Sequence, residues 1–188
     1  MEKYYHFYSK NKLKIIDLKE VIASSFHDDY QIYYNEYTKE GYILSNESFY
    51  DSLLLFHPLL LSDFGDSITF LVSYENTILS QYALRFAAKN FPSRINNISD
   101  IYLYTITKND LSIHNYLNKI FESLNYDLMQ TGLTFILSGL NATLAAKRLY
   151  IHRNTFNYRL NKFIEQTSLD IRDFDNALLL YIYNKAKK

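Results

Sequence analysis

The residues best suited to recognising a charged partner gather near the C-terminal end of the chain. Residues 128–164 contain no Asp or Glu, but they include these basic residues: Lys147, Arg148, His152, Arg153, Arg159 and Lys162. Because the whole chain balances 20 Lys and Arg against 20 Asp and Glu, this segregation of charge is local. An acid-free segment in a balanced protein suits a polyanion, although a solvated basic helix face has the same composition.

The order of residues in this segment predicts two helices joined by a very short turn. The first helix spans residues 143–149 and is expected to have Thr143 as its N-cap. The second spans residues 153–166, and Ala146 is small enough to let it cross closely over the first. Two helices with so short a connection are typical of a helix-turn-helix.

The second helix has two distinct faces. Helical spacing predicts one buried stripe made of Phe156, Leu160, Phe163 and Ile164. Another face has no acid and carries Thr155, Tyr158, Arg159 and Lys162. Cations on such a face reach DNA phosphates, while hydroxyl, amide and guanidinium groups reach base edges in the major groove.

Residues 146–160, AKRLYIHRNTFNYRL, resemble the C-terminal helix-turn-helix of PucR/CdaR-type bacterial transcriptional regulators, and also the Fis-type DNA-bending factor. The first family shows A-K-R-L, a hydrophobic pair, H-R-N-T, an apolar residue and Y-R-L. The resemblance covers about the last third of the chain. It departs from the family at Gly132, where Leu is usual, and at Ser168, where the family's T-G-x-D has Gly.

The resemblance implies a set of DNA-contacting residues, which are Thr143, Lys147, Arg148, His152, Arg153, Asn154, Thr155, Asn157, Tyr158, Arg159 and Lys162. Those expected to face the groove are His152, Arg153, Thr155, Asn157 and Arg159, and those expected to contact the DNA backbone are Lys147, Arg148 and Lys162. Asn154 is expected to serve partly as a helix cap, and Tyr158 either donates to a phosphate or covers the helix. His152 has the alternative role of a capping or core histidine. Arg153 and Arg159 are expected to lack a local ion-pair partner, because no acid is near them in sequence.

The fold class predicted for the chain is α+β, with an N-terminal mixed antiparallel sheet and flanking helices followed by an all-α helix-turn-helix domain. Residues 1–109 form the sensing or dimerisation domain, residues 110–125 a connecting helix, and residues 126–188 the DNA-binding domain. The N-terminal elements predicted are helices at 13–26 and 77–89, a hairpin at 31–37 and 41–44, a second hairpin at 53–61 and 67–74, and a strand at 100–107. The helices expected beyond them span residues 110–124, 127–137, 143–149, 153–166 and 173–186.

Several function classes lack the residues they need. With no Cys, the chain has no thiolate zinc site and no cysteine nucleophile, and its histidines show no metal-binding spacing. Some regulators of the resembling family carry a degenerate GGDEF-like domain, but the G-G-[DE]-E-F signature is absent, and Asp63-Phe64-Gly65-Asp66 is explained by a tight turn. No enzyme activity, cofactor or metal is predicted. No membrane span or secretion signal is expected either, which favours the cytoplasm.

These features predict a DNA-binding transcriptional regulator that acts on double-stranded DNA as a homodimer. The many Tyr and Phe of residues 30–106 either line a pocket for an unidentified small-molecule effector or belong to the core, the sheet surface or a dimer face. Two alternatives stay open. One is a ligand- or protein-binding adaptor with a vestigial helix-turn-helix, and the other is a small enzyme in the N-terminal domain.

Overall fold

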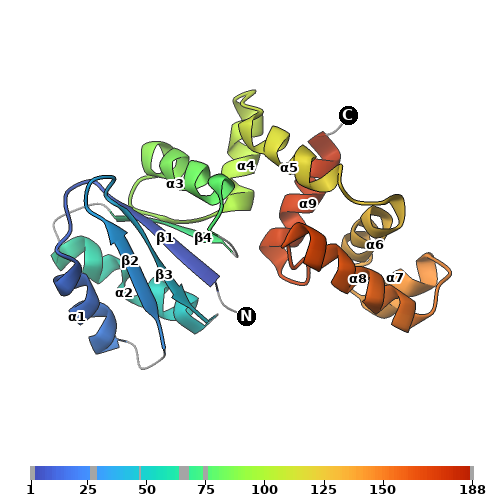
Figure 1. Ribbon diagram of the computed structural model, residues 1–188, viewed down its shortest axis with the longest axis horizontal. Coiled ribbons are helices and arrows are strands. Elements are labelled where there is room, and N and C mark those ends of the chain that lie inside the picture. The colour runs from blue at the N-terminus through green and yellow to red at the C-terminus, as the bar shows by residue number, and fades with distance from the viewer. Residues whose placement is uncertain (1–2, 26–28, 47, 64–67, 74–75, 187–188) are drawn as a thin grey trace. The chain divides into compact units, whose positions relative to one another are not determined.

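A mixed five-stranded sheet organises the first part of the chain in this computed structural model (Figure 1). Its strands are β1 (Lys3–Ser9), β2 (Gln31–Asn35), β3 (Glu40–Ser45), β4 (Ile68–Ser73) and β5 (Ile95–Asn97), in the order β2-β3-β1-β4-β5. Neighbouring strands are antiparallel except for β4 and β5, which are parallel. The predicted α+β class is therefore confirmed, with a sheet in the first part and helices alone in the last.

The structure describes residues 3–25, 29–46, 48–63, 68–73 and 76–186. Its contacts divide the chain into two compact units, Met1–Ile101 and Tyr102–Lys188. The division falls within helix α4 (Ile98–Thr107), ahead of the connecting helix expected at residues 110–125.

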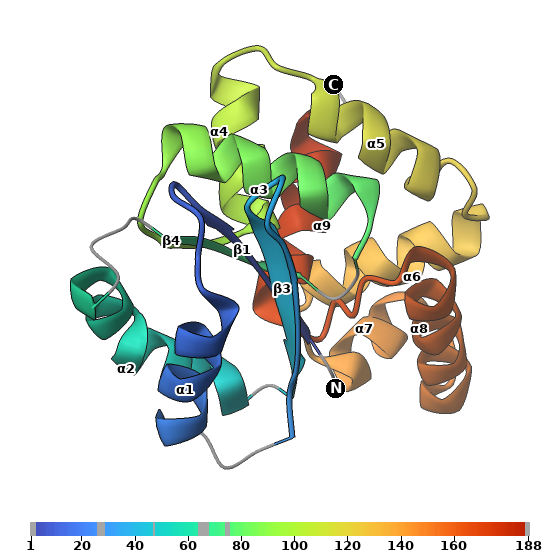
Figure 2. The ribbon, with the colours of Figure 1, turned by 60° about the vertical axis from the view of Figure 1, so that its left-hand side comes forward.

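Helices cover both faces of the sheet in the first unit. Helices α1 (Ile15–Ser25) and α2 (Ser48–Asp63) lie on one face, and α3 (Ile78–Asn90) lies on the other (Figure 2). The first face has a continuous apolar core that includes Tyr5, Phe7, Leu18, Ile22, Ile43, Phe49, Leu53 and Phe70. Tyr5 and Phe7 are two residues apart on β1, so the alternation of the strand sends both to this core.

Helix α1, the β2–β3 hairpin, helix α3 and the strand β4 are confirmed among the N-terminal elements predicted from the sequence. Thr77 caps α3, its hydroxyl accepting a hydrogen bond from the N–H of Ser80 at 3.3 Å, and Phe91 ends the helix. Phe26, expected at the end of the first helix, lies outside the described residues.

The strand predicted at residues 53–61 is wrong, because these residues belong to helix α2. Its buried residues Phe49, Leu53, Phe56 and Leu60 are spaced by four, three and four, which is a helical period. Exposed leucines between them fill the other side of the helix and hide that period in a continuous apolar run. Residues 68–73 do form the predicted strand, whereas residues 64–66 of the expected hairpin turn lie outside the described residues.

The strand predicted at residues 100–107 is also wrong, because this segment is helix α4. Its Ile, Leu, Tyr and Thr residues favour strands individually, but Ile101 and Thr105 are buried one helical turn apart. Two strands, β1 at the centre of the sheet and the short parallel β5, were not predicted from the sequence. Strand β5 has only three residues and is specified by pairing with β4 rather than by an apolar pattern.

The second unit consists of helices, and every helix predicted for it is confirmed. After α4 they are α5 (Ser112–Phe121), α6 (Tyr126–Leu137), α7 (Ala142–Arg148), α8 (Arg153–Thr167) and α9 (Phe174–Ala186). Phe121 of α5 joins their core, with its ring centroid 4.5 Å from that of Tyr183 in α9 and 6.3 Å from that of Phe163 in α8.

Gly132 explains one departure from the resembling family. It is buried in α6, and a Cβ there would lie 3.0 Å from Cε2 of Phe163 and 3.3 Å from Cδ2 of Leu180. A leucine at this position would displace both side chains, because a close-packed core has no space for the four carbons of its side chain. The glycine thus lets α6, α8 and α9 approach one another.

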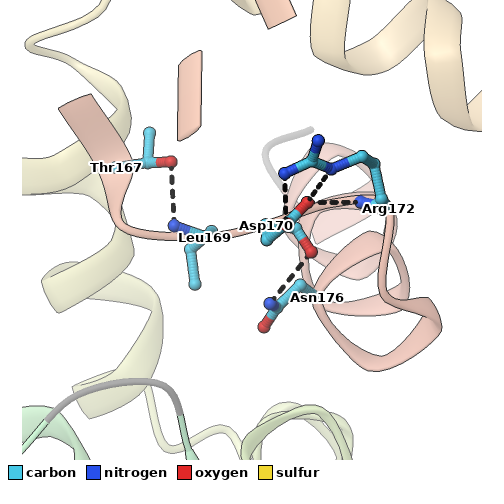
Figure 3. Close-up of polar contacts among 5 residues, drawn as sticks. All are labelled: Thr167, Leu169, Asp170, Arg172 and Asn176. Carbon is cyan, nitrogen blue, oxygen red and sulfur yellow. Dashed lines mark hydrogen bonds and ion pairs between the residues drawn. The ribbon is translucent and has the colours of Figure 1, made fainter. Parts of the chain in front are cut away.

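A hydrogen-bonded loop joins α8 to α9 (Figure 3). The hydroxyl of Thr167 accepts a hydrogen bond from the N–H of Leu169 at 3.2 Å, and Asn176 of α9 donates to the carbonyl of Asp170 at 3.1 Å. Arg172 donates to both carboxylate oxygens of Asp170, at 2.7 and 2.6 Å. Ser168 begins the loop with a φ of 56°, in the left-handed region where the family's usual Gly is favoured.

The pKa of Asp170 reflects two opposing effects. Partial burial raises the pKa of its carboxyl group, but the hydrogen bonds and positive charge of Arg172 outweigh burial, so the pKa lies below its ordinary value. An acid whose pKa is lower in the folded than in the unfolded state stabilises the fold above the unfolded value. That contribution is lost as the pH falls through the folded-state pKa.

We predict that Asp170→Asn lowers the free energy of unfolding by about 1–2 kcal/mol at neutral pH, since charge-assisted hydrogen bonds to a side chain only 13% exposed are lost. Thermal unfolding measured from pH 7 to pH 3 checks this. The variant and the natural chain should converge in stability as Asp170 becomes protonated. A difference that stays constant with pH would contradict the pairing, and Glu122→Gln, an exposed change of the same charge, is the control.

Candidate nucleic-acid interface

Helices α6, α7 and α8 pack together as a helix-turn-helix with one preceding helix (Figure 1). Ala145 and Ala146 of α7 are buried, as expected for two helices that cross closely. The rings of Phe135 in α6 and Phe156 in α8 lie 5.9 Å apart. Of the stripe predicted on α8, Phe156, Leu160 and Phe163 are buried and Ile164 is half-buried.

The turn between α7 and α8 is held by backbone hydrogen bonds. Tyr150 has a φ of 56°, and its N–H donates to the carbonyl of Lys147 at 3.2 Å. The N–H of Ile151 donates to the carbonyl of Ala146 at 3.1 Å. This pair of bonds is a Schellman motif, which ends α7 sharply and leaves only a short connection before α8.

The residues that cap α7 and α8 differ from two of the predictions. Asn141 caps α7, its side-chain oxygen accepting a hydrogen bond from the N–H of Leu144 at 3.0 Å. Thr143 is not the N-cap, because α7 begins earlier and places Thr143 within its first turn, exposed. His152 caps α8 by accepting from the N–H of Asn154 at 3.2 Å, so the capping alternative for His152 is confirmed and the expected cap at Asn154 is wrong.

Most of the predicted contact residues are exposed. These are Thr143, Lys147, Arg148, His152, Arg153, Asn154, Thr155, Asn157 and Tyr158, whereas Arg159 and Lys162 are half-buried. Asn161 is also exposed, and it was not among the predicted contact residues. It follows Arg153 and Asn157 at intervals of four, and this spacing is the signal that identifies it.

Arg159 has an ion-pair partner, contrary to the prediction. Its Nη2 lies 2.7 Å from Oδ2 of Asp127, which is in the first turn of α6, and its side chain is 27% exposed. Asp127 immediately precedes the acid-free segment, so sequence separation hid a contact that the packing of α6 on α8 creates. Arg159 therefore lies at the flank of the exposed face of α8 and not at its centre.

Two more of the basic residues also have partners within the unit. Arg148 donates to the carbonyl of Leu137 at 2.6 Å and to the hydroxyl of Ser138 at 3.1 Å, at the C-terminal end of α6. Lys162 donates to Glu165 at 2.8 Å, and this hydrogen bond raises the pKa of its ammonium group. Among the described residues, only Lys147 and Arg153 of the five predicted Lys and Arg contacts have a side chain without a partner.

The described residues contain no group of three or more His, Asp and Glu placed to hold a metal ion. None of the helices described is both long and apolar enough to cross a membrane.

Comparison with known proteins relates the last third of the chain to a known domain family. A family model described as the PucR C-terminal helix-turn-helix domain matches residues 128–186. The uncharacterized protein YxkF of Bacillus subtilis is 46% identical over 55 residues, which are 29% of this chain and 18% of that protein.

Two relatives have a named role. The carbohydrate diacid regulator of Escherichia coli is 57% identical over 37 residues, which are 20% of this chain and 10% of the relative. The proline-responsive transcriptional activator PutR of Bacillus subtilis is 36% identical over 61 residues, which are 32% and 15% of the two chains. The matches thus span less than a fifth of the length of each relative.

We predict that Asp127→Asn increases the affinity for duplex DNA by about two- to fivefold at low salt, because a negative charge beside the exposed face of α8 is removed and Arg159 is released. Fluorescence anisotropy with a labelled duplex, measured over a range of salt concentrations, checks this. Glu122→Gln makes the same charge change on an exposed residue outside this face and should have a smaller effect. Weaker binding by Asp127→Asn would instead show that Asp127 holds Arg159 in its binding position.

Proposed function

We propose that this chain, whose residues 128–186 form a PucR-type C-terminal helix-turn-helix domain, is a DNA-binding transcriptional regulator. Helix α8 enters the major groove of double-stranded DNA, and α7 lies across the backbone. One observation carries the proposal. Arg153 is exposed at the first position of α8, in a segment without acids, and its side chain has no partner among the residues that the structure describes. Such a guanidinium is free to make a bidentate contact with guanine.

The contact residues divide into two groups. Arg153, Asn157 and Asn161 lie one turn apart on the exposed side of α8 and are assigned to base edges. The group assigned to phosphates and to the flanks of the interface comprises Thr143, Lys147, Arg148, His152, Asn154, Thr155, Tyr158, Arg159 and Lys162. Lys147 is the strongest phosphate contact of this group, because its charge is not used elsewhere in the described structure.

A homodimer follows from the size of the interface, because one helix-turn-helix buries little surface on DNA. A two-fold dimer reads two half-sites about 34 Å apart. The outer side of α2 supports self-association, because Leu55 and Leu59 are 79% and 56% exposed and lie one turn apart beside Leu54. No charged residue lies between Asp51 and Asp63 in this helix, so two copies of the surface meet without repulsion.

The first unit also offers a place for a small-molecule effector. A hollow of about 230 Å³ lies beside α3, and its lining includes His6, Tyr33, Tyr42, Glu40 and Arg85. Arg85 and Glu40 form a bidentate pair at 2.6 and 3.0 Å. Aromatic faces next to a paired charge suit a small polar ligand. We assign this unit to sensing or dimerisation without catalysis, in a protein that acts on DNA in the cytoplasm.

We predict that Arg153→Ala weakens binding to a preferred duplex, selected from a random pool, by about 1–3 kcal/mol and relaxes specificity at one base pair. Binding of the variant and the natural chain to all single-base changes of that duplex checks this. An equal loss on every duplex would show a phosphate contact instead. Lys119→Ala, which removes an exposed charge from α5, is the control. Failure of the natural chain to bind any duplex would favour an adaptor with a vestigial helix-turn-helix.

We predict that the natural chain sediments as a dimer and that the double change Leu55→Ser and Leu59→Ser shifts it to monomer, because burial of these leucines drives association. Sedimentation velocity over a range of concentrations gives the result. Leu103→Ser, on the exposed side of α4, is a matched control that should leave the dimer intact. A natural chain that remains monomeric at every concentration contradicts the dimer.

A further inference from the structure

We propose that Tyr150, in the turn between α7 and α8, binds the DNA backbone. Its ring packs against a deoxyribose and its hydroxyl donates to a phosphate oxygen. The inference rests on the proposed function and adds a residue that the sequence pattern did not place among the contacts. Three observations carry it: the backbone conformation of Tyr150, the exposure of its side chain, and its position between Lys147 and Arg153, the two predicted cationic contacts without a side-chain partner in the described residues.

The backbone of Tyr150 is in a conformation that its side chain disfavours. Its φ is 56°, in the left-handed region that Gly adopts without cost, and it occupies the C′ position of a Schellman motif, where Gly is preferred. A residue with a Cβ is destabilised there, most strongly when its side chain is bulky. An unfavourable conformation of this kind points to a role outside the stability of the fold.

Tyr150 is 95% exposed, so packing of its side chain does not offset the cost of its backbone conformation. The other non-glycine residues with positive φ are Lys39, Ser93, Asn109, Leu140 and Ser168. Leu140 is half-buried, and Lys39 donates to the carbonyl of Lys10 at 2.9 Å. Asn109 needs no such support, because asparagine tolerates the left-handed region better than most residues. Tyr150 therefore combines a large side chain and a positive φ with almost complete exposure.

Tyr150 lies between two residues that are assigned to the proposed DNA interface. It follows Lys147 by three residues and precedes Arg153 by three, and these are the two predicted Lys and Arg contacts whose side chains have no partner in the described residues. The next residue, Ile151, is half-buried, so the turn directs Ile151 inward and Tyr150 outward. Exposure alone does not define such a site. Tyr37 is 97% exposed, but it follows Glu36 in a hairpin turn of the first unit.

A tyrosine contact differs from a lysine contact in its dependence on salt. The phenol is neutral, so it releases no counterion when it meets the backbone, whereas each Lys or Arg contact contributes about −0.9 to the slope of log K against log salt. Loss of Tyr150 should therefore lower affinity at every salt concentration by the same factor. It should also lower affinity for every sequence equally, because backbone contacts do not read bases.

The test compares Tyr150→Gly and Tyr150→Asn with the natural chain in two measurements, thermal unfolding and binding to duplex DNA over a range of salt. Both substitutions relieve the backbone, and Asn adds less flexibility to the turn than Gly. We expect both variants to unfold at a higher temperature and to bind DNA about tenfold more weakly, with an unchanged salt slope. Tyr150→Phe, which loses only the hydroxyl, should keep the natural stability and lose part of the affinity.

Two controls complete the experiment. Ser168→Gly relieves the same backbone conformation at the end of α8 and should raise stability without changing DNA binding. Lys147→Ala should reduce the steepness of the salt slope by about 0.9, which Tyr150→Gly should not.

The outcomes separate this inference from the proposed function. Natural affinity in Tyr150→Gly together with weak binding by Arg153→Ala overturns the role of Tyr150 alone. Lower stability in both Tyr150→Gly and Tyr150→Asn also overturns it, because the ring would then support the fold. If the natural chain binds no duplex, the proposed function and the inference both fail.

Discussion

The packing of α8 against α6 is the constraint on which the candidate interface depends. One side of α8, which carries Phe156, Leu160 and Phe163, faces the interior of the second unit. Gly132 of α6 lets the two helices approach closely. Because a helix has a fixed rotation per residue, burial of this side decides which residues face solvent. Arg153, Asn157 and Asn161 are exposed as a consequence of where the aromatic side chains are buried.

Three of the five Lys and Arg side chains in residues 128–164 have partners within the fold, so they are not free for DNA. Asp127 pairs with Arg159, the C-terminal end of α6 binds Arg148, and Glu165 binds Lys162. The contacts of Arg159 and Arg148 join α6 to α8 and α7, and the two carboxylates reduce the net positive field at the surface. Charge that is already paired contributes less to DNA affinity than a count of Lys and Arg indicates. Lys147 and Arg153 therefore have a disproportionate share in the proposed interface.

The success of sequence-based prediction differed between the two units for a physical reason. In the second unit, α6, α7 and α8 begin at side-chain caps and are joined by short connections, so local spacing was enough to locate them. In the first unit, α2 is apolar on most of its circumference, and α4, which spans the division between the units, is rich in residues that favour strands. Both were predicted as strands. The pairing of β5 with β4 is non-local and leaves no pattern in three residues.

The amino-acid sequence by itself determined the helix-turn-helix, its acid-free segment and its likeness to PucR-type domains, because these depend on residues close together in the chain. Only the tertiary structure decided which basic residues are paired, that His152 and Asn141 are the caps, and that Tyr150 is exposed with a positive φ. Those properties depend on distances between helices and on backbone angles. Asp127 and Arg159 are 32 positions apart in the chain, and the contact of α6 with α8 brings them within 2.7 Å.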